Sequence, residues 1–240
     1  MSIDLNCDMG EGCGNDEAIM PFITSANIAC GYHAGNEETM HTTILLAKKH
    51  GVHIGVHPSF PDKGNFGRTE MQLPPQEVYD LVTEQLKLFQ TIADACKATV
   101  HHVKPHGALY NMAARDQELA NAIAAAVKNF NSQLVMYGLG NSFLSSEAKR
   151  LGLKTKSEVF ADRTYQDDGS LTPRSHTGAL IEDERSALKQ VLQMIQSKTA
   201  TTLSGKKIPI VAETVCIHGD GKHAVSFAKQ LHAAIHKFNL

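Results

Sequence analysis

Short apolar runs alternate with longer segments of helical periodicity along the whole chain. The runs predict buried strands at residues 3–7, 25–30, 52–56, 99–103, 133–137, 153–160 and 208–217. Apolar residues at helical spacing predict helices at residues 37–50, 76–96, 116–130, 141–151, 182–197 and 222–237. Asn36 is the expected N-cap of the first helix, and Pro74 and Pro75 open the longest one.

This alternation of strand and helix predicts an α/β fold with a parallel sheet. Seven units in 240 residues average about 34 residues each, close to the length of a strand–helix unit. A seven-stranded (β/α) barrel is favoured over an open sheet, although the alternation fits both. No linker-like composition interrupts the chain, so residues 1–240 are expected to form a single domain.

Two long segments lack strand or helix periodicity. Residues 57–73 and 161–179 each follow a predicted strand, where the loops of parallel α/β folds form the active-site face. Because long irregular loops in compact domains are usually functional or disordered, and because these carry aromatic and arginine residues, we expect ordered lids. Residues 198–207 are polar and predict a surface loop.

Composition excludes several classes of protein. Apolar residues make up 42% of the chain and charged residues 20%, as in soluble globular proteins, and the net charge of −2 argues against nucleic-acid or membrane-surface binding. The sequence shows no signal peptide and no run of ~20 apolar residues. Five cysteines without a CxxC pair predict free thiols in a reducing cytosol.

Four histidines share one local context. Each of them follows a predicted strand, next to glycine or proline: His33, His57, His106 and His218. The first strand ends in the same way, at Asp8. Because the carboxyl ends of parallel strands meet on one rim, we expect these side chains to converge in an active site.

The chemistry of that site is open at this level. An acid with several histidines is suited either to a divalent metal or to metal-free acid–base catalysis. Lys104, two residues before His106, is suited to stabilising an oxyanion or a phosphoryl oxygen. No dinucleotide fingerprint, P-loop or nucleophile elbow occurs. Cysteines near strand ends are interpreted as packing residues, and a Ser-His-Asp triad has no support from spacing.

At these residues the sequence resembles the LamB/YcsF family. The blocks that carry the resemblance run in order through the chain, at residues 3–12, 25–35, 57–62, 64–68, 102–111, 158–165 and 217–220. The resemblance implies a variant (β/α) barrel akin to glycoside hydrolases and deacetylases. It also implies the A subunit of a bacterial ATP-dependent 5-oxoprolinase, which cleaves 5-oxoproline to L-glutamate with ATP hydrolysis, Mg²⁺ accompanying the nucleotide. That enzyme requires B and C subunits as partners.

Residue roles follow as hypotheses from this chemistry. Asp8 and His106 would form an acid–base pair, with His57 and His33 shaping or sharing that role. Lys104 and Arg163 would hold phosphoryl oxygens or the substrate carboxylate. The remaining candidates are expected to bind substrate or to orient the histidines: Asn6, Glu158, His218 and Asp220.

Two other functions stay open. One is a metal-dependent deacetylase or carbohydrate hydrolase, by analogy with the superfamily, and whether the chain binds a metal is unknown. The other is a non-catalytic subunit that binds the lactam and presents it to its partners.

Overall fold

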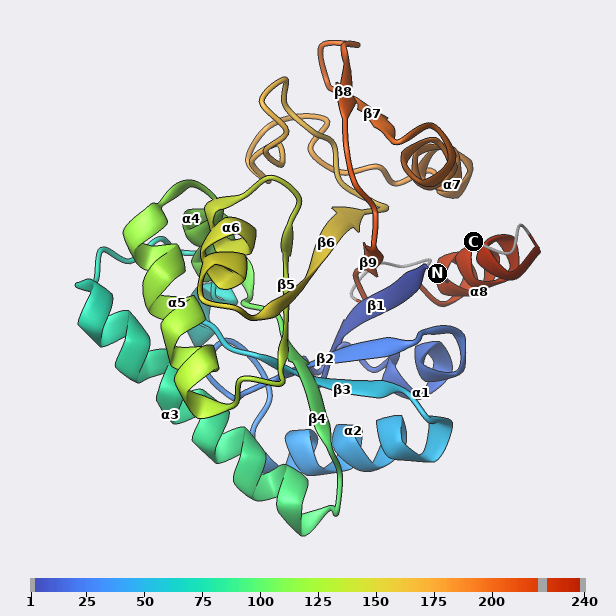
Figure 1. The fold of residues 1–240 in the computed structure, drawn as a ribbon. Coiled ribbons are helices and arrows are strands. Elements are labelled where there is room, and N and C mark those ends of the chain that lie inside the picture. Colours follow the sequence, from blue (N-terminus) through green and yellow to red (C-terminus); the bar gives the residue numbers. More distant parts are fainter. Residues whose placement is uncertain (1–2, 220–223, 238–240) are drawn as a thin grey trace.

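A computed structural model describes residues 3–219 and 224–237 as a closed barrel of parallel strands surrounded by helices (Figure 1). Neighbouring strands around the barrel follow chain order, and the last strand closes it against both the first and the sixth. The barrel strands are β1 (Asp4–Met9), β2 (Ser25–Ala29), β3 (His53–His57), β4 (Val100–Val103), β5 (Val135–Leu139), β6 (Lys154–Phe160) and β9 (Thr214–Ile217). The predicted α/β barrel of seven strands is confirmed.

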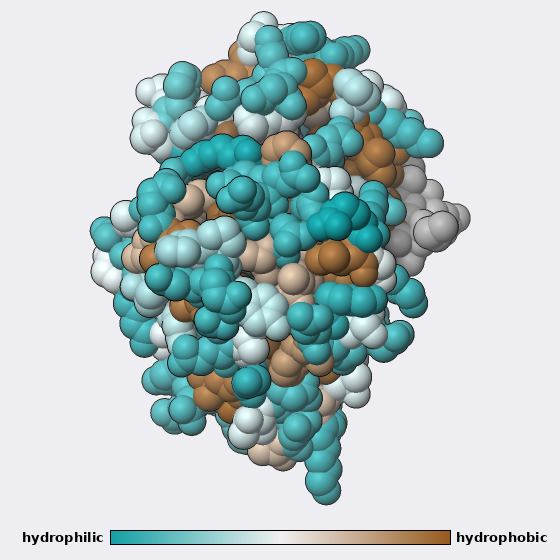
Figure 2. All heavy atoms as spheres, turned by 60° about the vertical axis from the view of Figure 1, so that its left-hand side comes forward, coloured by the Kyte–Doolittle hydropathy of each residue, from teal (hydrophilic) through white to brown (hydrophobic). Residues whose placement is uncertain are grey.

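The helices cover the outside of the barrel. They are α1 (Asp16–Ile19), α2 (Glu37–His50), α3 (Pro75–Ala95), α4 (Gly107–Arg115), α5 (Gln117–Phe130), α6 (Phe143–Arg150), α7 (Glu184–Leu192) and α8 (Ala224–Lys237), with short turns η1 (Met20–Phe22), η2 (Lys63–Asn65) and η3 (Gln193–Ser197). Asn36 caps α2 as predicted, since its side chain accepts a 2.9 Å hydrogen bond from the Thr39 amide. The face that carries α3 and α5 is mainly hydrophilic, with small separate apolar patches (Figure 2).

The prediction of a seventh strand at residues 208–217 is wrong over its first half. Residues 207–209 form β8 (Lys207–Pro209), which pairs antiparallel with β7 (Thr199–Thr201) outside the barrel, and only β9 enters it (Figure 1). The predicted surface loop at residues 198–207 therefore contains a strand. Pro209 has no backbone N–H, which suits the edge of a two-stranded sheet better than the middle of a barrel strand.

Polar side chains fill the barrel interior. Every residue of β1 is buried. Side chains alternate along the strand, so that Leu5, Cys7 and Met9 join the hydrophobic core and the polar residues between them form hydrogen bonds across the lumen. Asp4, at the amino end, accepts hydrogen bonds from the hydroxyls of Thr24, Ser25 and Thr214 at 2.6–2.7 Å. Because buried polar groups require partners, the strands are held in register by this network as well as by their backbones.

The two long loops are ordered by their own hydrogen bonds, as expected. In the first, the Asp62 carboxylate accepts from the Thr69 amide and from Asn65, and the Gly67 amide donates to the Asp62 carbonyl. In the second, residues 163 and 180 and residues 165 and 171 form isolated bridges. Thr202 on the β7–β8 hairpin donates to Asp167 at 2.6 Å, which ties that hairpin to the second loop.

Within the described residues, no helix is long and apolar enough to cross a membrane.

Candidate active site

A cavity of about 620 Å³ opens at the carboxyl ends of the barrel strands. Its lining takes one residue from the end of most strands, together with parts of both long loops. The strand-end residues are Asp8, His57, Lys104, Leu139, Phe160 and His218. The convergence predicted from sequence is therefore present in the fold, at the face where (β/α) barrels carry their active sites.

A buried ammonium group lies at the floor of this cavity. Nζ of Lys104 is 2.8 Å from Oδ1 of Asp8, 2.9 Å from Oε1 of Glu158 and 3.2 Å from Oδ1 of Asn6, and it donates to Sγ of Cys216 at 3.1 Å. Lys104 is 2% exposed. Lys104 is therefore placed to fix the two carboxylates, and it also lines the cavity.

The charges of this cluster stabilise each other. Burial alone would raise the pKa of Asp8, but the positive charges of His57 and Lys104 hold it well below its ordinary value. Burial would lower the pKa of Lys104, but Asp8, Cys216 and Glu158 raise it well above its ordinary value. Asp8 is thus an ionised carboxylate at the floor of the cavity.

Asn27 binds Asp8, and His102 in turn binds Asn27. Asn27 donates through Nδ2 to Oδ1 of both Asn6 and Asp8 at 2.8 Å, and its own Oδ1 lies 2.8 Å from Nε2 of His102. His102 is fully buried and stacks on Tyr137, with ring centroids 4.1 Å apart. Because Gly55 has no side chain, the His102 ring can lie against its backbone; a Cβ there would be 2.1 Å from Nε2.

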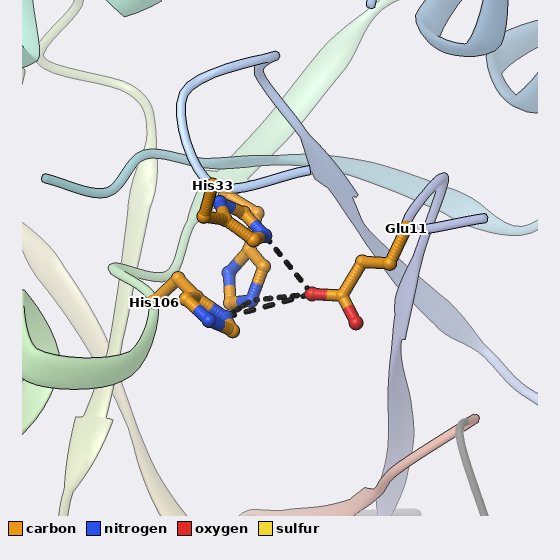
Figure 3. A group of neighbouring side chains, drawn as sticks. Glu11, His33 and His106 are labelled. Atoms are coloured by element: carbon orange, nitrogen blue, oxygen red, sulfur yellow. Dashed lines mark hydrogen bonds and ion pairs between the residues drawn. The ribbon is translucent and has the colours of Figure 1, made fainter. Parts of the chain in front are cut away.

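Three histidines and Glu11 form a second group beside Asp8 (Figure 3). Oε1 of Glu11 is 3.0 Å from Nε2 of His33, 3.5 Å from Nδ1 of His106 and 3.8 Å from Nε2 of His57. The rings of His33 and His106 stack with centroids 3.8 Å apart, and His57 lies edge-on to both. The four ligand atoms all lie within 4.8 Å of one another, so the group is a candidate metal site.

The first long loop packs directly on these rings. Gly67 has φ +66°, and a Cβ at this residue would lie 2.8 Å from Cβ of His33 and 2.9 Å from Cδ2 of His106. The backbone carbonyl of Phe66, the preceding residue, lies 2.9 Å from Nε2 of His106. Only glycine permits both this backbone conformation and this close approach. The loop therefore sets the orientation of the histidine that it covers.

Burial keeps two of the rings neutral. It lowers the pKa of His33 to about 3, with a further contribution from the positive charge of His57. Burial, followed by the charges of His33 and His57, holds the pKa of His106 well below its ordinary value. Neutral imidazoles offer lone pairs, which is the form required of a metal ligand or a general base.

Positive side chains line the wall of the cavity that the second long loop forms. Arg163 donates to the carbonyl of Thr172 at 2.6 Å, and its Nε is buried without a hydrogen-bond partner. Burial and the neighbouring charge of Arg174 lower the pKa of Arg163 to about 10. Nη2 of Arg174 is 3.2 Å from His218, whose other ring nitrogen lies 2.8 Å from Oδ2 of Asp162. Two guanidinium groups beside each other favour an anionic ligand.

The structure brings most sequence-predicted residues together and pairs two of them, Lys104 and Glu158, with each other. Asp8, Asn6, Lys104 and Glu158 share the floor, His33, His57 and His106 adjoin it, and Arg163 and His218 line the cavity. Glu158 pairs with Lys104 instead of orienting a histidine. Lys104 binds two carboxylates at the floor of the cavity, and its expected role towards phosphoryl oxygens stays a prediction. Asp220 lies outside the described residues.

Sequence reasoning missed Glu11, Asn27 and Tyr110. Glu11 follows β1 beyond Gly10, whose φ of +70° turns the chain so that the carboxylate returns over the cavity. The signal was present, because the sequence places two carboxylates at one strand end. The hydroxyl of Tyr110 is buried near Glu158 and comes from α4, a helix that the pattern did not predict.

Residues 3–240 match the LamB/YcsF family. The chain belongs to this family. A solved structure described as a lactam utilization protein from Thermus thermophilus is 40% identical, with a TM-score of 0.92, and the match covers 100% of this chain and 98% of that one.

More distant solved structures share the fold of this LamB/YcsF member. A deacetylase with bound substrate has a TM-score of 0.52 at 11% identity, covering 99% of this chain and 84% of that one. Dispersin B has a TM-score of 0.53 at 11% identity, covering all of both chains. At this identity the likeness shows the barrel fold alone.

Proposed function

We propose that this chain is the A subunit of an ATP-dependent 5-oxoprolinase that works with B and C subunits and converts 5-oxoproline to L-glutamate. Family membership and the lactam utilization protein of Thermus thermophilus support a lactam substrate. The observation that carries the proposal is the arrangement of the cavity: an ionised carboxylate, Asp8, on the floor, neutral histidines beside it, and Arg163 and Arg174 on the wall.

This arrangement matches the demands of lactam opening. A five-membered lactam is an unactivated amide, and phosphorylation of its oxygen by Mg·ATP makes the ring carbon electrophilic. Water then adds to that carbon, the C–N bond breaks and the ring nitrogen takes a proton, which gives γ-glutamyl phosphate. A second water hydrolyses this acyl phosphate, so that phosphate leaves and L-glutamate is released. In the proposal Asp8 and the neighbouring histidines accept the proton of water and return one to nitrogen, while the arginines bind the carboxylate or phosphoryl oxygens.

Lys104 acts in this scheme as a positioning residue. It forms ion pairs with Asp8 and Glu158 and holds them in place, and it keeps the pKa of Asp8 low, which maintains a base of defined orientation in a site shielded from water. A cavity of about 620 Å³ also lies within the range of ligand pockets, and it leaves room for a phosphorylated ring.

The test is release of L-glutamate from 5-oxoproline and Mg·ATP by the chain alone and together with the B and C subunits. We expect glutamate only in the complete mixture, and a loss of ~10²-fold or more with Asp8→Asn. Asp80→Asn, an exposed aspartate on α3, is the matched control and should keep full activity. No glutamate from the folded, assembled wild-type proteins would refute the proposal. Full activity of Asp8→Asn would point instead to a lactam-binding subunit without a catalytic role.

A second candidate function is a metal-dependent amide or ester hydrolase, because Glu11 and three histidines form a potential metal site in the same cavity. It predicts hydrolysis of N-acetylated substrates without ATP, and loss of that activity after dialysis against a chelator. Glutamate formation that depends on ATP and on the B and C subunits would exclude this candidate as the main activity.

A further inference from the structure

The hydrogen bonds of His57 and His106 fix the position of the proton on each ring. Nδ1 of His57 lies 2.6 Å from the carbonyl oxygen of Lys104, and Nε2 of His106 lies 2.9 Å from the carbonyl oxygen of Phe66. A carbonyl oxygen only accepts, so each of these nitrogens carries the hydrogen. When both rings are neutral, the remaining nitrogens, Nε2 of His57 and Nδ1 of His106, are lone pairs that face each other at 3.0 Å, and Nε2 of His57 also lies 3.4 Å from Oδ2 of Asp8.

A hydroxyl lies beside His33. Oγ of Ser59 is 2.9 Å from the carbonyl of Phe60 and 2.9 Å from Nδ1 of His33, so that when its hydrogen is donated to Phe60 it accepts from Nδ1 of His33. In that tautomer Nε2 of His33 is a third lone pair. It lies 3.0 Å from a carboxylate oxygen of Glu11, which is also an acceptor.

In these neutral tautomers three imidazole lone pairs and one carboxylate oxygen converge within 4.8 Å of one another, and acceptor faces acceptor in two contacts. We propose that Glu11, His33, His57 and His106 bind a divalent transition-metal ion of the Zn²⁺ type. A metal ion resolves both contacts at once. The outward hydrogen bonds to backbone carbonyls and to Ser59 are those that orient metal-bound histidines in proteins.

The distances suit such an ion. Zn²⁺ binds nitrogen and oxygen at about 2.0–2.2 Å, which places neighbouring ligand atoms of a tetrahedral site about 3.4 Å apart. The separations here are 3.0 Å from His57 to His106, 3.0 Å from His33 to Glu11 and 3.5 Å from His106 to Glu11. The stacked rings of His33 and His106 must tilt apart for both lone pairs to point at one ion.

A neighbouring group of potential ligands is less suitable. Asp8, Cys216 and His218 also lie within ligand distance of one another. The ammonium of Lys104, however, is 2.8 Å from Asp8 and 3.1 Å from Cys216, so a metal ion there would have to displace a buried cation. The metal site is therefore assigned to the group of Glu11 and the three histidines, and Lys104 already neutralises the other group.

The experiment is titration of the full chain with ZnCl₂ by isothermal calorimetry, after removal of metal with EDTA, and with CoCl₂ by visible spectroscopy. We expect one ion per chain and ligand-field bands of low-symmetry Co²⁺. His33→Gln and His106→Gln should each weaken zinc binding by ~10²-fold or more. Ser59→Ala keeps all four ligands but removes the acceptor that orients His33, and should weaken binding by about 10–100-fold.

His53→Gln is the matched control. His53 stacks on His101 at the amino end of the barrel, with centroids 4.2 Å apart, and its loss should leave zinc binding unchanged. Folded wild-type protein that binds no zinc, or zinc binding that survives His33→Gln and His106→Gln, would overturn the assignment. The assignment would also be overturned if the protein does not bind zinc and ¹⁵N NMR of the zinc-free form shows protonated rings. Protons rather than a metal would then lie between the facing acceptor atoms. No substrate is present, so the outcome is separate from that of the glutamate assay.

Discussion

Nζ of Lys104 lies 2.8 Å from Oδ1 of Asp8, and both side chains are almost fully buried. Removing one partner of such a pair leaves the other charge in a medium of low polarity. Lys104→Met should therefore lower the free energy of unfolding by ~3–5 kcal/mol, measured by urea denaturation. Arg115→Met is the control, because the side chains of Arg115 and its partner Glu70 are 61% and 48% exposed, and the change should cost about 1 kcal/mol or less.

A double variant separates the charge effect from lost packing. Adding Asp8→Asn to Lys104→Met removes the unpaired charge, so the combined loss of stability should be smaller than the sum of the two single losses. Strictly additive losses would mean that the two groups do not interact.

Gly55 should tolerate no side chain while His102 is present. A Cβ at residue 55 would lie 2.1 Å from Nε2 of His102, so Gly55→Ala should destabilise the protein by ~1–3 kcal/mol or more through overpacking. Gly64→Ala, in open space on the surface, should change stability by less than about 0.5 kcal/mol. In a His102→Ala background, Gly55→Ala should cost much less. An equal cost in both backgrounds would contradict the steric explanation.

His102 should make the protein less stable in mild acid. Burial, with the charges of His101, Lys156 and His53, holds the pKa of His102 well below its ordinary value, although Asp4 opposes the shift. The unfolded chain then binds an extra proton below pH ~6.5, so stability falls as pH decreases through this range. Denaturation at pH 8, 6.5 and 5 should show a shallower fall for His102→Gln than for wild type. His41→Gln, on the exposed face of α2, should keep the wild-type slope.

Arg174 should contribute to substrate affinity more than to turnover. Its guanidinium lines the cavity next to Arg163, where an anionic group of the substrate would be held in ground state and transition state alike. Under the proposed function, Arg174→Gln should raise KM for 5-oxoproline ~10-fold or more and leave kcat within a few-fold. Arg185→Gln, exposed on α7, should change neither. A fall in kcat at constant KM would assign Arg174 to the chemical step instead.

The sequence predicted the barrel and the position of its site because strand ends carry strong local signals. A histidine or aspartate after an apolar run, near glycine or proline, marked the ends of β1, β3 and β9 and the residues after β2 and β4. The split between β8 and β9 was not predictable from apolarity, because Ile208 and Val215 look equivalent in sequence and differ only in which sheet they join. Helix α4 was missed because its first residue, Gly107, belongs to the motif that ends the strand.

The roles of the site residues were harder to predict from the sequence than their positions. Lys104 was expected to hold an incoming anion, since the sequence cannot show that Asp8, Asn6 and Glu158 already surround it. The polar lumen, in contrast, had a readable signal. Asp4, Asn6 and Asp8 alternate with apolar residues in a strand that is buried on both faces, and such a pattern indicates an inward-facing polar network.

Closure of the barrel depends on strands from opposite ends of the chain, since Asp4 pairs with Thr214 and Cys7 with Ile217. During synthesis β1 therefore has one open edge until β9 has been made. Lys104 contacts Cys216 of β9, so its buried surroundings are complete only when β9 inserts. Truncation before residue 214 would expose the edges of β1 and β6 together, and we expect such fragments to aggregate rather than to persist as inactive barrels.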